Sequence, residues 1–146
     1  SIEWWFRKLE DSVDWSNLWG PNKCSNIENI GTNEWAIFIG ASNSNSYGFM
    51  IESGNNRYSI NSENPLELTD WNQIVGVKDE NEMRLYFNGI FVTSSNIDLN
   101  MNINSTNSDI LISNNTYSDT SNFFIWNKPL NGIDVWDNYN LLISRY

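Results

Sequence analysis

The sequence contains no histidine, one cysteine and few cations, and these absences remove several classes of function. Without histidine there can be no Ser-His-Asp or Cys-His catalysis, no imidazole general base and no zinc site that uses histidine. Cys24 cannot form a disulfide within the chain, and no imidazole activates its thiol, so we expect it to be inert. Eight Lys and Arg against eighteen Asp and Glu give a formal charge of −10, which excludes nucleic acid and anionic lipid as main partners.

Long apolar runs are also missing. No stretch of 18 apolar residues is present, so we expect no membrane-spanning helix and no membrane insertion. Aromatic residues make up 14% of the chain and include eight tryptophans, which argues for a packed core and against disorder. A chain of 146 residues supports one such core, so we predict a single domain over 1–146.

Apolar and polar residues alternate with a period of two along most of the chain, which is typical of half-buried strands. In 1–8, Ile2, Trp4 and Phe6 fall on one face, and Trp5 falls on the other. We expect further strands at 34–39, 47–52, 57–60, 71–77, 83–87, 90–93, 96–107, 109–113 and 122–126. No helix of ordinary length is predicted. The pattern therefore predicts an all-β fold, an antiparallel jelly-roll β-sandwich of two sheets.

Two turns connect the strands in the middle of the sequence. Residues 78–82 form a polar stretch of hairpin-loop length, and Asn88-Gly89 is typical of a type I′ turn. We expect Trp71, Leu85 and Phe87, which flank these turns, to fill the space between the two sheets.

Residues 69–95 carry the most specific pattern. Residues 69–77 read TDWNQIVGV and, after the polar turn, 85–92 read LYFNGIFV. Together with SIEWWFR at 1–7 and IWNKPL at 125–130, this order resembles the laminin G-like, concanavalin A-like lectin/glucanase jelly roll. GIDV at 132–135 could instead be the family's closing motif. The strand that usually precedes the family's tryptophan strand is absent, so we expect an open sheet edge and a fragment of a longer chain.

The chain is more distantly similar to the lectin-like half of clostridial neurotoxin receptor-binding regions and their nontoxic companions. The shared features are Asn- and Ile-rich strands and the asparagine-glycine hairpin. This resemblance implies a large secreted assembly, where such a jelly roll is often a spacer. The expected location is extracellular or secreted, or a virion surface.

Catalysis would have to rest on carboxylates. Glucanases of the wider superfamily carry two of them on one strand, spaced as Glu-x-Asp-x-Glu or Glu-x-Asp-x-x-Glu. No such strand occurs here. The acidic clusters at 10–14 and 79–82 lie in expected loops, where neighbouring carboxylates are usually solvated. We therefore predict that the protein is not an enzyme.

Aromatic rings that stack on sugars, with amides and carboxylates that bond the hydroxyls, point to glycan binding. Trp15 and Trp19 are expected in a loop among polar residues, and Trp5 lies on an outer face. Packing at the rim of the domain is the alternative role for each candidate. The predicted function is a non-catalytic carbohydrate-recognition or adhesion module that binds glycans or glycoproteins through Trp5, Trp15, Trp19, Tyr47 and Tyr117.

Calcium is a possible cofactor through Asp11, Asp14 and Asp119, although no spacing resembles an EF-hand loop. The alternative function is structural: a spacer or docking jelly roll in a secreted toxin complex or a virion. In that role a protein partner would complete the open sheet edge. The sequence does not separate the two functions.

Overall fold

The computed structural model describes residues 1–8, 16–21, 34–41, 44–53, 56–62, 70–98, 110–114 and 118–146, and for β2, β9 and parts of β3 and β4 it describes the backbone alone. Within these ranges the chain forms ten strands and one helix. They are β1 (Ile2–Lys8), β2 (Ser16–Pro21), β3 (Glu34–Ala41), β4 (Ser44–Ser53), β5 (Asn56–Asn61), β6 (Trp71–Asp79), β7 (Glu82–Phe87), β8 (Ile90–Asn96), β9 (Ile110–Asn114), β10 (Ser118–Ile125) and α1 (Gly132–Ile143).

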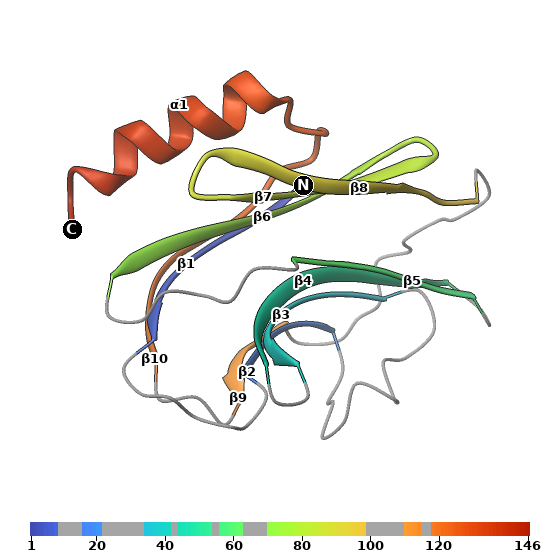
Figure 1. The fold of residues 1–146 in the computed structure, drawn as a ribbon, viewed down its shortest axis with the longest axis horizontal. Helices are drawn as coiled ribbons and strands as arrows, with labels where there is room; N and C mark the ends of the chain where they lie inside the picture. The colour runs from blue at the N-terminus through green and yellow to red at the C-terminus, as the bar shows by residue number, and fades with distance from the viewer. Residues whose placement is uncertain are drawn as a thin grey trace.

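The strands form two five-stranded antiparallel sheets that lie face to face (Figure 1). The first sheet has the order β10-β1-β6-β7-β8 and the second β5-β4-β3-β2-β9. Strand β1 therefore lies between β10 and β6, with Trp4 opposite Phe123 on one side and Ile74 on the other. This arrangement confirms the predicted all-β jelly-roll sandwich.

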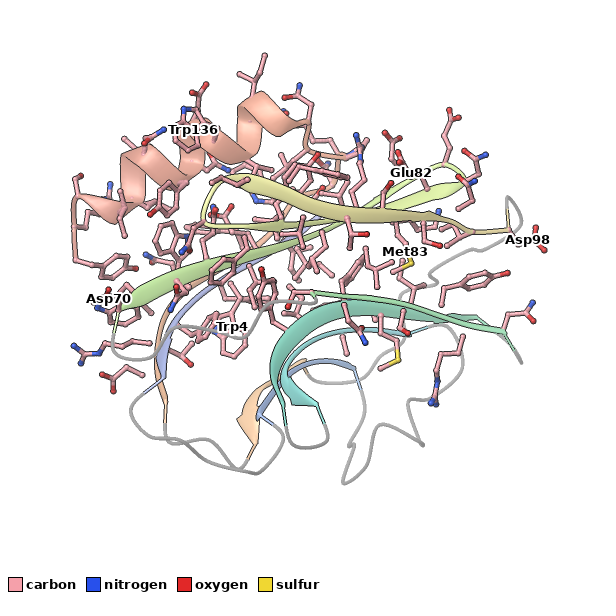
Figure 2. The ribbon with its side chains drawn as sticks, in the orientation of Figure 1. Trp4, Asp70, Glu82, Met83, Asp98 and Trp136 are labelled. Atoms are coloured by element: carbon pink, nitrogen blue, oxygen red, sulfur yellow. The ribbon has the colours of Figure 1, made fainter. Side chains whose placement is uncertain are left out.

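The main core fills the space between the sheets. In Figure 2, Trp4 and Met83 point from the first sheet toward the second. Because side chains alternate across a strand, every second residue enters this core. The predicted core face of β1 is confirmed. The buried cluster consists of Ile2, Trp4, Phe6, Trp35, Ile37, Tyr47, Phe49, Ile51, Ile60, Ile74, Met83, Leu85 and Ile97.

Helix α1 lies across the outer face of the first sheet (Figure 1), so the expectation of no helix was wrong. It begins with a capping box in which Asn131 Oδ1 accepts a hydrogen bond from Asp134 N. Val135 and Leu142 are its buried residues. Val135 joins Val75, Val77, Tyr86 and Leu130 in a second apolar cluster on the outer face of the sheet. None of the helical structure in the described ranges is long and apolar enough to cross a bilayer.

Both predicted turns are present, and the first is tighter than expected. Strand β6 continues to Asp79 and β7 begins at Glu82, so the turn has two residues, with Glu80 at φ 45°. At the second turn, Asn88 and Gly89 have φ values of 49° and 81°, which confirms the left-handed conformation that a type I′ turn requires.

Three further predictions need correction or fall outside the description. Residues 16–21 form β2, and not the loop expected around Trp19. Trp71 does not lie between the sheets, because Ile74 faces the core and Trp71, three residues earlier, faces the opposite way. The strand expected at 96–107 lies mostly outside the described residues, of which Asn96 ends β8 and Ile97 is buried in the core.

Candidate functional site

A groove of about 460 Å³ opens where the C-terminal half of α1 meets one end of the first sheet. Figure 2 places Asp70 at this end of the molecule. The groove is built by the end of β1, the start of β6, the turn after β7 and the helix. We call it the α1 groove, and its described lining residues are Arg7, Asp70, Trp71, Asn72, Asn88, Tyr139, Ile143 and Tyr146.

Aromatic rings form a continuous wall beside the α1 groove. The rings of Trp71 and Tyr146 stack with their centroids 4.3 Å apart. Tyr146 also contacts Trp5, at 5.4 Å, and Trp5 stacks on Tyr139 of α1 at 5.7 Å. Trp5 is fully buried in this wall, whereas Tyr146 is 41% exposed and presents apolar ring surface to solvent.

Two asparagines form an ordered polar strip along the α1 groove. Asn72 Nδ2 donates to the Asp70 carbonyl oxygen at 2.8 Å, and Asn88 Nδ2 donates to Asn72 Oδ1 at 3.1 Å. Asn88 Oδ1 accepts a hydrogen bond from the backbone N–H of Gln73 at 2.8 Å. These bonds fix the orientation of both amides and leave each Nδ2 with a second N–H.

The two charged side chains that line the α1 groove differ in whether they have an oppositely charged partner. The Arg7 guanidinium donates from Nε and Nη2 to Asp119 Oδ2 and lies 5.4 Å from the centre of the Trp71 ring. The side chain of Asp70 is exposed, and its carboxylate has no hydrogen-bond or ion-pair partner among the described residues. The anion is therefore available to a ligand, and the cation is already paired.

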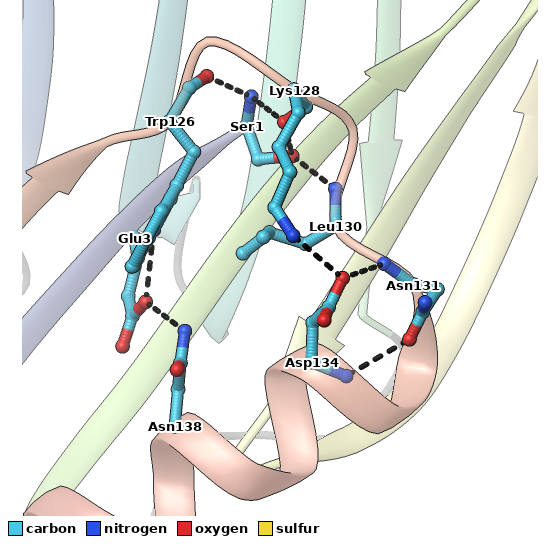
Figure 3. Close-up of polar contacts among 8 residues, drawn as sticks. All are labelled: Ser1, Glu3, Trp126, Lys128, Leu130, Asn131, Asp134 and Asn138. Carbon is cyan, nitrogen blue, oxygen red and sulfur yellow. Dashed lines mark hydrogen bonds and ion pairs between the residues drawn. The ribbon is translucent and has the colours of Figure 1, made fainter.

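A buried carboxylate holds α1 against the sheet. Glu3 is completely buried on the outer face of β1. Its Oε1 accepts bonds from Trp5 Nε1 at 2.9 Å and Gln73 Nε2 at 2.8 Å. Its Oε2 accepts bonds from Trp126 Nε1 and Asn138 Nδ2, both at 3.2 Å (Figure 3). Because Asn138 belongs to α1, this network positions the neighbouring Tyr139 in the wall of the α1 groove.

The segment that leads into α1 is tied to the start of β1. Ser1 Oγ donates to the Lys128 carbonyl oxygen at 3.0 Å and accepts from Leu130 N at 2.8 Å (Figure 3). Asp134 Oδ2 accepts bonds from Asn131 N and Lys128 Nζ. These bonds fix the first turn of α1, at the end of the helix opposite the α1 groove.

Two of the predicted ligand-binding aromatics are buried, so their rings cannot contact a sugar. Trp5 lies on the outer face as predicted, but α1 and Tyr146 cover it. Tyr47 is 5% exposed in the main core, where it stacks on Phe87 with centroids 4.4 Å apart. Burial raises the pKa of the Tyr47 phenol, and its bond with Ser62 acts in the opposite direction.

The structure describes only some of the other residues predicted to bind a ligand or calcium. Trp19 pairs with Ala36 through β2, and its side chain is not described. Asp119 pairs with Arg7. The described residues contain no group of three His, Cys, Asp or Glu that could hold a metal ion. Four of the predicted site residues lie outside the described ranges: Asp11, Asp14, Trp15 and Tyr117.

The residues that build the α1 groove were not among the predicted site residues. A signal for Trp71 was present, because an odd separation from Ile74 places it on the outer face of β6. Tyr139 and Tyr146 had no comparable signal, since their position depends on α1, whose sequence shows no clear helical periodicity.

Comparison with known proteins agrees with this fold. A laminin G family model, described as the concanavalin A-like lectin/glucanases superfamily, matches residues 1–135. No curated protein shows significant similarity to the chain.

Solved structures of neurotoxin receptor-binding domains have the same fold. The botulinum neurotoxin DC binding domain in complex with SialylT has a TM-score of 0.70 at 20% identity, with 97% of this chain and 35% of that chain covered. The botulinum neurotoxin type G receptor-binding domain has a TM-score of 0.66 at 18% identity, with 96% and 37% covered. This chain thus spans about a third of those chains. With a family model over 135 of its 146 residues and the matching jelly roll, the chain belongs to the concanavalin A-like lectin/glucanase superfamily.

Proposed function

We propose that this domain is a non-catalytic carbohydrate-recognition module and that the α1 groove is its binding site. One observation carries the proposal: the α1 groove combines exposed aromatic surface with oriented amides and a free carboxylate. The C–H faces of a sugar pack on aromatic rings, and its hydroxyls both donate and accept hydrogen bonds. Tyr146 and Trp71 supply the rings, and Asn88 and Asp70 supply the polar partners.

The structural neighbours support glycan and protein partners. One is described in complex with SialylT, another in complex with rat synaptotagmin II, and a third through the interaction of neurotoxin type C with two ganglioside molecules. By analogy with these toxin domains, we place the present domain in a secreted or extracellular setting.

Absence of catalysis is part of the proposal. A retaining glycosidase needs two carboxylates about 5 to 5.5 Å apart on either side of the scissile bond. Among the described residues that line the α1 groove, Asp70 is the one carboxylate. Asp119, behind Arg7, is held in an ion pair. The groove therefore suits binding better than hydrolysis.

The sequence-predicted loop site remains a separate proposal. Trp15, Trp19 and Tyr117 would supply its rings, and Asp11 and Asp14 would supply oxygen ligands for calcium. The two sites differ in a measurable property, because binding at the loop site would depend on calcium and binding in the α1 groove would not.

A docking role is the second candidate function. Several large apolar side chains on α1 and β8 are exposed to solvent, which is common at surfaces that contact another protein. They are Ile90 (63% exposed), Phe91 (53%), Ile133 (73%), Trp136 (47%) and Leu141 (65%).

A glycan array with the purified domain, run with calcium and with a chelator, tests the proposed function. We expect chelator-resistant hits whose affinity falls about tenfold in Asp70→Ala, because a hydrogen bond to a charged group contributes about 1.5–3 kcal/mol. Asp137→Ala is the matched control, since Asp137 is an exposed acidic residue of α1 that does not line the groove. A blank array from folded protein would refute carbohydrate recognition and favour docking.

A further inference from the structure

We infer that the α1 groove selects neutral saccharides over acidic ones, such as sialylated, uronic or sulfated sugars. The inference rests on the proposed function and specifies its ligand class. It rests on the pairing of three charged side chains at the groove: Arg7 pairs with Asp119, and Asp70 has no partner among the described residues.

The cation of the α1 groove already has an anionic partner. Asp119 accepts hydrogen bonds from two nitrogens of Arg7, and the guanidinium also lies over the Trp71 ring. The cross-strand register holds this pair in place, because Arg7 of β1 is directly opposite Asp119 of β10. The two side chains of this pair are 39% and 43% exposed, so an acidic sugar that approached the guanidinium would lie beside the Asp119 carboxylate and be repelled by it.

The unpaired charge in the α1 groove is negative. The Asp70 carboxylate is exposed, has no partner among the described residues and repels a ligand carboxylate or sulfate. A carboxylate accepts hydrogen bonds and donates none, so it suits the hydroxyls of a neutral sugar. The formal charge of −10 on the whole chain adds to the repulsion of anions.

The remaining polar groups are neutral and complement Asp70. Asn88 is half-buried and retains one N–H that can donate to a sugar oxygen, whereas Asn72 is 4% exposed and orients Asn88 through its Oδ1. The Tyr146 hydroxyl is already engaged, because it donates to Ser121 Oγ and accepts from Asn122 Nδ2, each at 2.6 Å. Tyr146 therefore contributes its ring, and Asn88 with Asp70 contributes the polar contacts of an uncharged ligand.

Titration of matched pairs of oligosaccharides, followed by calorimetry, tests the inference. Lactose with 3′-sialyllactose is the first pair, and further pairs that differ only in one acidic group come from the array. At low salt we expect the neutral member to bind about tenfold more tightly, and this ratio to fall as salt screens Asp70. An acidic member that binds as tightly as its neutral partner would overturn the inference.

Two variants test which side chains produce the preference for neutral sugars. Asp70→Asn keeps the size of an exposed side chain. It should reduce the ratio of neutral to acidic sugar affinity about fivefold, because it removes the repulsion between Asp70 and an acidic sugar. Asp119→Asn should narrow it as well, because it frees Arg7 to bind an anion. Asp137→Asn is the control for net charge and should leave the ratio unchanged.

The outcomes separate this inference from the proposed function. If neutral and acidic sugars both bind, and the ratio is the same in Asp70→Asn as in the wild type, the groove binds carbohydrate but its charges do not select the ligand. If no saccharide of either kind binds the folded domain, the proposed function fails and the selectivity fails with it.

Discussion

Glu3 is a completely buried carboxylate whose four hydrogen bonds all come from neutral donors. Two donors are indole N–H groups and two are side-chain amides, from three strands or their ends and from α1. Burying a carboxylate is costly unless its oxygens are fully satisfied, and here each oxygen accepts two bonds. The network therefore links the attachment of α1 to the sheet with the geometry of the α1 groove.

Glu3→Gln should destabilise the domain by about 1–3 kcal/mol, because a glutamine NH₂ would face two N–H donors and leave buried donors unsatisfied. The free energy of unfolding in urea measures the change. The matched control is Glu80→Gln at an exposed turn position, which should alter stability by less than about 0.5 kcal/mol. Equal stability of Glu3→Gln and the wild type would mean that the network does not hold the helix.

Residue-level roles were predictable where alternation alone decides them. The core positions of Trp4 and Phe6 followed from the period of two, and both residues lie in the buried cluster. Tyr47 was predicted to bind a ligand, but alternation along β4 places it in the core with Phe49 and Ile51. Alternation placed Trp5 on the outer face of β1, but its burial depends on α1, whose Tyr139 stacks on the indole ring.

At the scale of elements, the strands were predictable and α1 was not. Its buried positions, Val135 and Leu142, lie seven residues apart as expected for a helix. Ile133, Trp136 and Leu141 are also apolar and face solvent, so the sequence shows no clear apolar stripe. The cap was a usable signal, since Asn131 stands three residues before Asp134.

Gly89→Ala should destabilise the domain by more than about 1 kcal/mol, because alanine is strained at positive φ. Gly89 has φ 81°, and a Cβ atom there would lie 2.7 Å from the Trp136 ring and 3.1 Å from Tyr139 Cβ. The substitution should therefore displace α1 as well. Urea unfolding measures the loss of stability, and near-ultraviolet circular dichroism reports the displaced tryptophan.

Gly132→Ala is the control for this prediction. Gly132 is the first residue of α1, and a Cβ atom there would lie 3.8 Å from the Tyr86 ring, an ordinary contact. Alanine favours a helix more than glycine does, so this variant should be as stable as the wild type or more so. If both alanine variants behaved alike, the turn conformation would not explain the requirement for glycine at 89.

At the scale of the whole molecule, periodicity predicts strands but not their order. In the first sheet β1 pairs with β10, the last strand of the chain, and with β6. No local pattern encodes such pairings, because they depend on which faces pack together after the chain has folded. The motif at 69–95 carried the information instead, through its resemblance to a family with this topology, and the family match confirms it.

The whole molecule combines a large negative charge with exposed apolar side chains on α1 and β8. At neutral pH the charge of −10 opposes self-association. The isoelectric point is about 4.2, so the charge falls toward zero as the pH is lowered to that value. We expect the sedimentation coefficient to rise as the pH is lowered from 7 toward 4.5, because apolar contacts are then no longer opposed.

A double substitution, Ile133→Ser with Leu141→Ser, tests whether these side chains form the contact. They are 73% and 65% exposed, so their replacement should change stability little and should reduce the association at low pH. Ser94→Ala, at an exposed position of β8, is the control and should leave the association at low pH unchanged. If the double variant associates as strongly as the wild type, the loss of charge acts through another surface, and the docking role loses the observation that favours it.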